Sequence, residues 1–466
     1  MNQTTMTNLQ QAAGWMAGAR VVGDASRTFT RVHTDSRTVE PGDLFVALQG
    51  ERFDAHDFLA DVIARGAAAV LVSRETGLDV PAIVVPDTRI GLGELGAGWR
   101  RQFTLPTVAV TGSNGKTTVK EMIAAIFAAA VGESDRLATG GNLNNDIGLP
   151  LTVLRLRAHH KLAVLELGMN HPGETVYLAG IAQPTVAVIT NAQREHQEFM
   201  VSVEAVAHEH ASALAALPAD GVAVFPLDAE SGGAHAQIWR QAAAGRRVMA
   251  FGTDPSADVR ATVSLDDGVQ VLHVTAPGQT FDLRLQLLGA HNVRNALAAT
   301  ACALAAGVDV AAIQAGIAGF TAVKGRLQVR HTAGGTVLID DTYNANPDSM
   351  RAAIDVLAGF AAPRLLVLGD MGEVGNQGPA FHAEIGDYAR TRGIEALWAT
   401  GQLATHAVQA YGPAGRHFDK ADDLAQALSE DKEGTVAGAS AVLVKGSRFM
   451  RMERMVDALV ATPSAH

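Results

Sequence analysis

The stretch Thr107–Thr118 constrains this chain more than any other part of its sequence. A β-rich run, Thr107–Val110, leads into a glycine-bracketed turn and then into Lys116–Thr118. After the turn, apolar residues recur at i, i+3, i+4 and i+7, as they do on the buried face of a helix. These residues are Val119, Met122, Ile123, Ile126, Phe127 and Ala130. Gly132 suits the C-terminal cap of that helix. The pattern predicts a strand, a turn and a helix in direct succession.

A glycine turn between a strand and a helix can cradle phosphate groups, because its backbone N–H groups point at anionic oxygens. Lys116 adds a point charge, and Thr117 can hold Mg²⁺. We therefore expect a nucleotide at Thr111, Gly112, Ser113, Asn114, Gly115, Lys116, Thr117 and Thr118. The match to G-x-x-x-x-G-K-[ST] is imperfect, since Val110 stands where the first glycine belongs. An ordinary strand–helix turn that contains Gly-Lys is the competing interpretation.

The composition is that of a soluble α/β protein, with 48% apolar and 18% charged residues in a chain of 466. A formal net charge of −11 gives no basic surface for nucleic acid. Cys302 is the single cysteine and lies in an apolar helical pattern, so we expect it to be packed rather than reactive. We expect no signal peptide, and no apolar stretch of the sequence is long enough to span a bilayer. We expect a cytoplasmic monomer without membrane insertion.

The length and the pattern of elements predict three domains, with boundaries at residues 1–102, 103–323 and 324–466. In the first domain, strand-like runs at 43–48, 68–72 and 82–85 alternate with a helical run at 58–65. Ser36 and Arg37 lie in a polar segment before the first of these runs and could meet a phosphate or a sugar. A plain polar loop explains the same segment more simply.

In the second domain, polar residues follow two further segments. The loop 140–150 contains Asn142 and Asn145, whose amides could cap a helix or bind a polar ligand. The buried strand pattern 161–168 carries Glu166 near its C-terminal end, where ligands of open α/β sheets bind. A carboxylate there is placed to hold the Mg²⁺ of a nucleotide, although a solvent-facing glutamate is the alternative. From 219 to 288 the pattern is mostly β.

Histidines gather after the strand pattern 185–190, but their spacing argues against a zinc site. His208 and His210 lie two residues apart on a predicted helix and point to opposite sides. A single histidine near the phosphates, such as His196, is the more plausible arrangement. Further on, Gly289–Asn295 opens an alanine-rich helix, in which Asn292 and Asn295 could face one ligand edge or provide the N-terminal cap.

The third domain shows βαβ alternation, with strands at 336–340, 364–368, 396–400 and 441–444. This alternation predicts a parallel sheet of Rossmann type. The strand ends are polar at 340–347, 369–375 and 445–448, but no G-x-G-x-x-G sequence follows them. A nicotinamide cofactor is therefore not supported.

Taken together, these pieces resemble the Mur ligase family over nearly the whole chain. The similar motifs, in chain order, are Asp35–Arg37 with Pro41–Ala47, Thr111–Thr118, Gly141–Pro150, Glu166–Asn170 and Gly289–Asn295. The family uses a shorter phosphate loop, which accounts for Val110. Asp341–Pro347, Leu368–Glu373 and Val444–Ser447 point to the branch of the family that uses D-alanyl-D-alanine. The resemblance implies an α/β protein of three domains, with a central ATP-binding domain and a C-terminal Rossmann-like domain.

The resemblance also implies an ATP-dependent amide ligase of peptidoglycan precursor synthesis. ATP would phosphorylate the carboxylate of UDP-N-acetylmuramoyl-tripeptide, and the amine of D-alanyl-D-alanine would then attack the acyl phosphate. Lys116, Mg²⁺ held by Thr117 and Glu166, and Arg326 would supply the positive charge that joins two anions. His196 would help to hold a second Mg²⁺.

Further residues receive roles by the same resemblance. Asn292 and Asn295 would contact the adenine side of the nucleotide, with Asp340 and Tyr343 approaching it from the third domain. Ser36 and Arg37 would lie near the uridine diphosphate, and Asn344 and Asn346 near the dipeptide. Asn142 and Asn145 complete the expected substrate residues.

One position departs from the family. Many members carry a lysine, modified to a carbamate that binds the second Mg²⁺, about fourteen residues after the histidine matched by His196. Here His210 stands at that place, and no carbamate can form on it. We expect His210 to bind the metal directly or through a water molecule, and nearby carboxylates such as Glu195, Glu198 or Glu209 could supply the missing charge. A packed helix residue without a metal role is the competing interpretation of His210. Two alternative functions remain open, a folylpolyglutamate synthetase type of ligase and a nucleotide-dependent switch.

Overall fold

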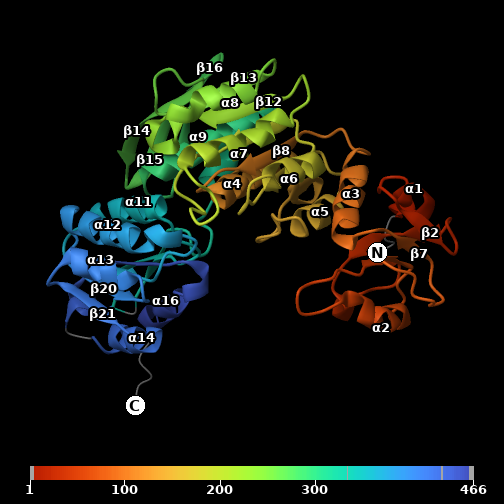
Figure 1. Ribbon diagram of the computed structural model, residues 1–466. Helices are drawn as coiled ribbons and strands as arrows, with labels where there is room; N and C mark the ends of the chain where they lie inside the picture. Colours follow the sequence, from red (N-terminus) through yellow and green to blue (C-terminus); the bar gives the residue numbers. More distant parts are fainter. Residues whose placement is uncertain (1–4, 333, 432–433, 461–466) are drawn as a thin grey trace.

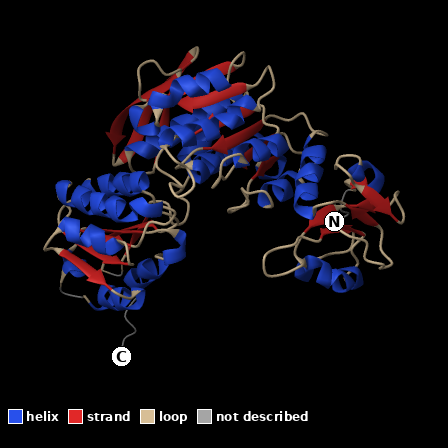
Figure 2. Cartoon of the chain, viewed as in Figure 1, coloured by secondary structure: helices blue, strands red, loops and turns tan. Residues whose placement is uncertain are grey.

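Three β-sheets follow one another along the chain (Figure 1). The computed structural model describes residues 5–332, 334–431 and 434–460. Helices lie against the sheets throughout, which confirms the expected α/β class (Figure 2). A small two-stranded sheet, β1 (Thr7–Asn8) with β3 (Thr28–Phe29), completes the strands of the N-terminal part.

The N-terminal sheet has five strands in the order β2-β7-β6-β5-β4. Its bounds are β2 Arg20–Val22, β4 Arg31–His33, β5 Asp43–Val46, β6 Ala69–Val72 and β7 Ala82–Val84. All neighbours are parallel except β2 and β7. The three strands and the helix expected here are found at nearly the expected bounds.

The central sheet has nine strands in the order β16-β15-β14-β13-β12-β11-β8-β10-β9. Its parallel strands are β8 Thr107–Thr111, β9 Arg136–Ala138, β10 Leu162–Glu166, β11 Val186–Ile189, β12 Val222–Pro226 and β13 Arg247–Gly252. Three more strands extend the sheet, β14 Val259–Asp266, β15 Val269–Ala276 and β16 Gln279–Leu285. β14 is parallel to β13, and the pairs β14–β15 and β15–β16 are antiparallel. Because β8 lies between β10 and β11, the C-terminal ends of these strands meet at one edge of the sheet.

The C-terminal sheet has six strands in the order β17-β18-β22-β19-β20-β21. Its bounds are β17 Gln328–His331, β18 Val337–Asp341, β19 Arg364–Leu368, β20 Ala396–Thr400, β21 Gly415–Phe418 and β22 Ala441–Lys445. The four expected strands are present and parallel, which confirms the Rossmann-like arrangement. Two edge strands were not expected, and one of them, β17, runs antiparallel to β18.

The helices connect these strands. Those before the C-terminal sheet are α1 Leu9–Ala13, α2 Leu59–Ala64, α3 Thr88–Arg100, α4 Lys116–Val131, α5 Gly148–Val153, α6 Glu174–Ala182, α7 Val203–Ala215, α8 Ala236–Ala242, α9 Ala290–Ala305 and α10 Val310–Ala318. The others are α11 Pro347–Ala358, α12 Gly378–Thr391, α13 Ala404–Tyr411, α14 Ala421–Glu430, α15 Thr435–Gly438 and α16 Glu453–Val460. No helix in the described ranges is both long and apolar enough to cross a lipid bilayer.

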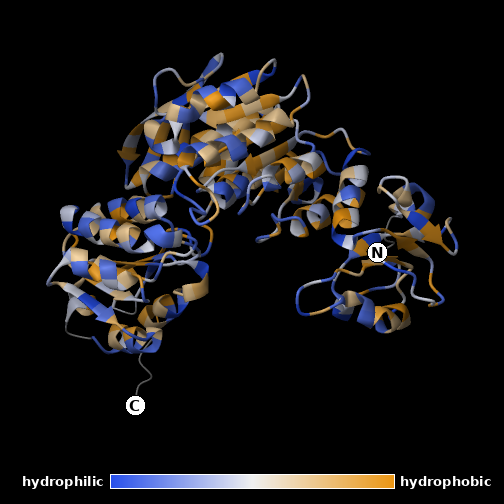
Figure 3. Ribbon diagram, in the orientation of Figure 1, coloured by the Kyte–Doolittle hydropathy of each residue, from blue (hydrophilic) through white to orange (hydrophobic). Residues whose placement is uncertain are grey.

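The strand, turn and helix around the phosphate loop are formed as the sequence predicts. β8 is buried over its whole length, and α4 buries Met122, Ile123 and Phe127 against the central sheet. Gly132 ends the helix with φ of 90°, and its N–H donates to Ala128 O at 2.9 Å. Apolar residues fill the strands, while hydrophilic residues dominate the loops at the strand ends (Figure 3).

The stretch 219–288 is mostly β, as expected, with α8 between β12 and β13. Two other points differ from expectation. Helix α3 occupies residues 88–100, where no element was expected. Asn292 and Asn295 do not cap α9; they lie inside the helix, and Gly289 occupies the cap position. The domain boundaries at 102/103 and 323/324 remain our proposal, and they fall between the sheets.

Candidate active site

A cleft of about 1020 Å³ lies where the phosphate loop of the central part faces the C-terminal part. Residues of the phosphate loop and the start of α4, and the loops after β10 and β11, line one side. Residues 325–327 and the loop after β18 line the other. Arg89 and Ile90 of α3 extend the wall toward the N-terminal part. The cleft is thus built from segments far apart in the sequence.

The phosphate loop presents its charge at the N-terminus of α4. Gly115 has φ of 80°, and a side chain there would collide with Asn295 Oδ1. Lys116 Nζ donates to Gly112 O at 2.5 Å and to Ser113 O at 3.2 Å. The ammonium therefore lies folded over its own turn, beside the backbone N–H groups of the helix start, which is the arrangement that attracts phosphate.

Glu166 faces the first turn of α4, so the alternative of a solvent-facing glutamate is wrong. Its side chain is buried at the end of β10, and Oε1 accepts from Thr117 Oγ1 at 3.2 Å and from Asn144 Nδ2 at 2.8 Å. Oε2 is buried and has no hydrogen-bond partner among the described residues. A carboxylate oxygen left free beside a threonine hydroxyl fits Mg²⁺, which takes one or two protein oxygens together with phosphates and water.

The C-terminal side brings a second cation to the same place. Arg326 Nη2 donates to Thr117 Oγ1 at 2.8 Å, and its guanidinium carbon lies 4.1 Å from the centre of the Tyr343 ring. Asn346 Nδ2 donates to Asn114 Oδ1 at 2.9 Å while its own oxygen caps α11. Tyr343, Asn344 and Asn346 all line the cleft. The C-terminal part therefore contacts the phosphate loop and the start of α4 directly.

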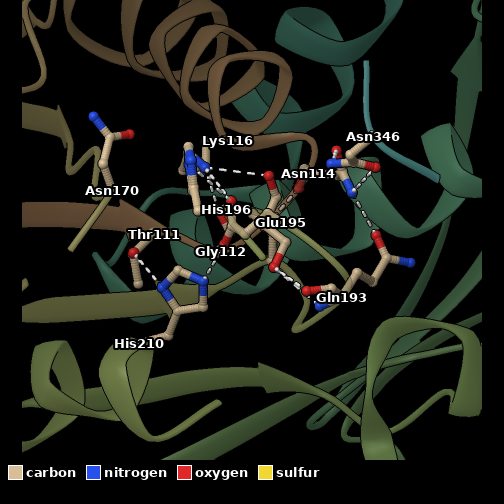
Figure 4. A network of polar contacts seen from close by, with 12 residues as sticks. Thr111, Gly112, Asn114, Lys116, Asn170, Gln193, Glu195, His196, His210 and Asn346 are labelled. Carbon is tan, nitrogen blue, oxygen red and sulfur yellow. Dashed lines mark hydrogen bonds and ion pairs between the residues drawn. The ribbon is translucent and has the colours of Figure 1, made fainter. Parts of the chain in front are cut away.

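A buried cluster of ionisable side chains lies behind the phosphate loop (Figure 4). Glu195 Oε1 is 2.8 Å from His210 Nε2, and its Oε2 is 3.4 Å from Lys116 Nζ. His210 Nδ1 is 2.9 Å from Thr111 Oγ1, so both ring nitrogens of His210 have protein partners. Burial alone raises the pKa of Glu195, but the charge of Lys116 and the hydrogen bond from His210 outweigh it and lower that pKa well below its usual range.

His196 lies next to this cluster in a left-handed backbone conformation, with φ of 46°. Its Nε2 is 3.8 Å from Glu195 Oε2, and its Nδ1 is 2.6 Å from Glu373 Oε2 of the C-terminal part. The neighbouring ring of His196 lowers the pKa of Glu373. Glu195, His196 and Glu373 line the cleft, whereas His210 does not. His210 therefore has no free ring nitrogen with which to bind a metal directly, contrary to expectation.

Asn292 and Asn295 lie on one face of α9 and line the cleft, as the spacing suggested. Asn295 Nδ2 donates to Asn292 Oδ1 at 3.0 Å, and Asn292 Nδ2 donates to Leu288 O at 2.8 Å. Their neighbour His291 also lines the cleft, and burial lowers its pKa to about 4. A neutral ring and two amides can contact a heterocyclic base without adding charge.

Several expected site residues lie away from the cleft. Asp35 holds the guanidinium of Arg37 at 2.7 Å, and neither Ser36 nor Arg37 belongs to the cleft wall. Asn142 is exposed outside the wall, whereas Asn145 lines it and accepts from Gly148 N at 2.8 Å at the start of α5. Asp340 is buried and bonds Thr342 in its own loop, so its neighbour Asp341 faces the cleft instead.

Asn144 and Lys445 line the cleft although neither was among the expected site residues. Asn144 holds the carboxylate of Glu166, and Lys445 Nζ lies 2.5 Å from Asp341 Oδ2 and 2.9 Å from Asn344 O. Asn144 stood in the asparagine-rich loop and Lys445 at a polar strand end, so both carried a signal. Which asparagine or strand end reaches the cleft depends on how the parts pack, and spacing along the chain does not contain that information.

The arrangement can bind phosphates on the loop, hold a hard cation at Thr117 and Glu166, and surround a transferring group with Lys116 and Arg326. A site of this kind suits phosphoryl transfer from a nucleotide to an anionic acceptor, because positioning and charge stabilisation supply most of the catalysis in such reactions. The cleft is closed only when the C-terminal part contributes its residues.

Comparison with known proteins assigns this site to a family. Three family profiles match in order, the "Mur ligase family, catalytic domain" at residues 28–99, the "Mur ligase middle domain" at 110–303 and the "Mur ligase, glutamate ligase domain" at 325–448. The chain is 40% identical over 456 residues to the UDP-N-acetylmuramoyl-tripeptide–D-alanyl-D-alanine ligase of Escherichia coli K12, which covers 96% of both chains. The protein belongs to the Mur ligase family.

Solved structures agree over the whole length. Crystal structure I of MurF from Acinetobacter baumannii matches with a TM-score of 0.90 and 36% identity, covering 99% of this chain and 100% of that one. MurF ligase from Thermotoga maritima in complex with ADP matches with a TM-score of 0.79 and 26% identity, covering 92% and 96%. The three-sheet architecture is therefore that of a MurF-like ligase.

Proposed function

We propose that this protein is the ATP-dependent ligase that joins D-alanyl-D-alanine to UDP-N-acetylmuramoyl-tripeptide in peptidoglycan precursor synthesis. The observation that carries the proposal is the convergence of Lys116, Glu166 with Thr117, and Arg326 on one cleft. Relatives that match nearly the full chain carry the name of this activity. The motifs and the full-length match favour this ligase over a folylpolyglutamate synthetase or a nucleotide switch.

In the proposed reaction the γ-phosphoryl group of ATP passes to the terminal carboxylate of the tripeptide. The amine of D-alanyl-D-alanine then attacks the acyl phosphate, and the amide forms with release of ADP and phosphate. The backbone N–H groups at the start of α4 and the ammonium of Lys116 hold the phosphates. Arg326 is stacked on Tyr343 and donates to the hydroxyl of Thr117 from the C-terminal side. Its positive charge offsets the charge of the second anion, the carboxylate of the tripeptide.

Thr117 and Glu166 would hold Mg²⁺, since Glu166 Oε2 is buried without a partner among the described residues. Bound Mg²⁺ would neutralise phosphate charge at this point. Asn144 fixes the orientation of the carboxylate through Oε1 and leaves Oε2 available. The protein thus supplies an oriented hard ligand rather than a complete cage, as Mg²⁺ sites on nucleotides usually do.

The remaining roles are assigned by position. Asn292 and Asn295 would face the adenine side, with Tyr343 approaching from the C-terminal part, and Asn344 and Asn346 would meet the dipeptide. Ser36 and Arg37 lie outside the cleft, so we propose that they meet the uridine diphosphate at the far end of an extended substrate. Arg89 and Ile90 line the cleft on the path between the two regions. We propose a cytoplasmic monomer.

Release of ADP measured with each substrate omitted in turn tests the function. Turnover should require ATP, the UDP-linked tripeptide and D-alanyl-D-alanine together, and Lys116→Ala should lower kcat by about 10²-fold or more, as losses at comparable electrostatic positions do. Circular dichroism verifies that the variant is folded. ADP release that continues without the dipeptide or without the tripeptide would favour the nucleotide switch. ADP release that requires glutamate and a folate, and not the dipeptide and the tripeptide, would favour a folylpolyglutamate synthetase.

A further inference from the structure

Glu195 is a buried carboxylate at the phosphate loop whose charge the proposed reaction does not use. Its side chain is only 4% exposed, yet it belongs to the wall of the cleft. Oε2 faces the ammonium of Lys116 at 3.4 Å and the ring of His196 at 3.8 Å. Figure 4 shows these groups together beside the turn.

The carboxylate is held in one orientation from behind. His210 is completely buried on α7 and reaches Glu195 Oε1 with Nε2 at 2.8 Å, while its Nδ1 meets Thr111 Oγ1 at the end of β8 at 2.9 Å. The hydroxyl, the ring and the carboxylate therefore form a chain from the central strand to the cleft. The chain fixes Oε1 and leaves Oε2 on the side of the phosphates.

An anion in this position opposes the ligand that the site is proposed to bind. Phosphate oxygens seated on the turn would meet the negative charge of Glu195 at close range, and Lys116 is a single charge that faces both. Like charges in a buried site repel strongly unless a cation lies between them. A carboxylate is also the hard oxygen ligand that Mg²⁺ prefers, while His210 has no free nitrogen to offer.

We propose that Glu195 and His196 bind a divalent cation together with phosphate oxygens of the nucleotide, and that His210 is the positioning residue for Glu195. This inference rests on the proposed nucleotide-dependent ligase activity and adds the ligands of a second cation to it. The described residues contain no cluster of three or more His, Cys, Asp or Glu side chains arranged to hold a metal ion. The site is therefore complete only with nucleotide oxygens and water as further ligands.

The charge that the family resemblance places on a modified lysine at position 210 would then come from a neighbouring loop. Glu195 lies fifteen residues before His210 in sequence, and the two side chains meet because α7 packs against β11 and β8. No bicarbonate is required for such a site, since an unmodified carboxylate carries the charge.

Manganese binding tests the site without relying on turnover. The full-length protein is mixed with an imido analogue of ATP that is not hydrolysed, and free Mn²⁺ is measured by electron paramagnetic resonance. We expect two Mn²⁺ per protein–nucleotide complex in the wild type and one in Glu195→Gln. The isosteric amide removes the charge and keeps a partner for His210. Glu198→Gln removes an exposed carboxylate of the same loop and should keep two.

Calorimetric titration of the nucleotide analogue separates the possible failures. Binding of the analogue with a single Mn²⁺ in the wild type, or with two in Glu195→Gln, overturns the second cation site while the proposed function stands. No binding of the analogue at all overturns the proposed function and this inference together. If the analogue binds but the second cation site is overturned, Glu195 serves only to orient Lys116.

The role of His210 has its own readout. His210→Ala should weaken binding of the second Mn²⁺ by about 10- to 100-fold, the range typical of residues that orient metal ligands, and leave the first unchanged. His208→Ala alters an exposed histidine one half-turn away on α7 and should change neither. Unchanged affinity for the second Mn²⁺ in folded His210→Ala would remove the positioning role.

Discussion

The two junctions of the central part differ in the forces that hold them. On the N-terminal side, α3 packs against α5 and α6 through buried Leu92, Leu95 and Trp99. One continuous apolar core runs from α1 and β5 through α3 into the central sheet. The N-terminal and central parts therefore share apolar surface that water does not reach.

On the C-terminal side, the contacts are mostly polar. Arg194, in the loop after β11, donates to Asp348 Oδ1 at 2.7 Å and to Glu384 Oε2 at 2.7 Å, and its backbone N–H donates to Asp348 as well. Asn114 with Asn346 and Thr117 with Arg326 add further polar contacts. The C-terminal sheet buries its apolar residues in cores that consist of its own part except for Leu288, which packs at the edge of one of them.

This difference indicates where the molecule can open. A junction made of shared core cannot separate without exposing apolar surface, while a polar junction can exchange its contacts for water at little cost. The candidate site is divided along the polar junction, so its two sides meet only when the C-terminal part closes. Closure would also exclude water from an acyl phosphate.

The largest expected effect breaks the apolar junction. Trp99 is 8% exposed, donates from Nε1 to Leu156 O at 3.2 Å and packs edge-on against Phe103. Trp99→Ala should lower the free energy of unfolding by about 3–5 kcal/mol, as loss of a buried aromatic side chain does. Urea denaturation followed by circular dichroism measures this, with the N-terminal and central parts losing stability together.

Trp398→Ala is the matched control, because this tryptophan is 6% exposed in a core of the C-terminal part alone. It should destabilise that part and leave the transition of the other two unchanged. If Trp99→Ala costs less than about 1 kcal/mol, far below the usual range for a buried tryptophan, the shared core does not hold the junction.

The next effect breaks the polar junction. Arg194→Ala removes the cation that reaches Asp348 and Glu384 across the junction, while Glu384 keeps its pair with Arg351 inside the C-terminal part. With these side chains 23% to 30% exposed, we expect about 1–2 kcal/mol, near the low end for desolvated interface pairs, or roughly a tenfold shift toward the open form. Small-angle scattering with the ATP analogue and the UDP-linked tripeptide should show a compact wild type and an expanded variant.

Arg351→Ala serves as the control for this experiment. Arg351 pairs with the same Glu384 at 3.1 Å, but both residues belong to the C-terminal part. Its loss should leave the compaction intact. Equal scattering from all three proteins, with both ligands bound, would show that Arg194 does not close the junction.

Features built from contiguous residues could be predicted from the sequence, whereas features that depend on contacts between distant residues could not. The phosphate loop was predictable because strand, turn and helix are contiguous between residues 107 and 131. Glu166 was predictable because parallel strands end at one edge of a sheet. Helix α3 was not, since its four glycines weaken the helical pattern.

Those glycines serve long-range contacts that no local pattern contains. A Cβ at Gly96 would lie 3.2 Å from Pro150 Cα, and one at Gly98 would collide with the Trp15 side chain. Their smallness makes the apolar junction close enough to form one core. Likewise, the meeting of Glu195 with His210 and of Arg194 with Asp348 depends on how loops, helices and separate sheets are placed in space.

Acid should loosen only the polar junction. Arg194, and then Arg351, lower the pKa of Glu384 below its usual 4.5 in the closed form. A carboxylate with a lowered pKa contributes closing free energy that is fully present above about pH 4.5 and is lost as the pH falls through the lowered value. Asp348 and both arginines face this group, so Glu384→Gln isolates its share. Scattering between pH 6 and pH 3 should show expansion of the wild type that begins below about pH 4.5, and a weaker pH response in the variant; equal responses would contradict the assignment.

Salt should give the smallest effect and the most direct separation of the two junctions. Raising sodium chloride from 0.1 M to 1 M shortens the screening length from about 10 Å to about 3 Å, which weakens ion pairs and leaves apolar contacts in place. Fluorescent labels at Ala60→Cys, Gln241→Cys and Ser429→Cys, taken in pairs, report each junction, because these positions are exposed and Cys302 is buried. With both ligands bound, fluorescence energy transfer between positions 241 and 429 should fall as salt is added. The fall should correspond to a loss of closing free energy of a few tenths of a kcal/mol, roughly, per exposed ion pair. Transfer between positions 60 and 241 should stay constant. A salt-dependent change between 60 and 241 would contradict the apolar character of the N-terminal junction. No change between 241 and 429, while Arg194→Ala still expands the protein, would mean that the pairs around Arg194 are too well buried for salt to reach.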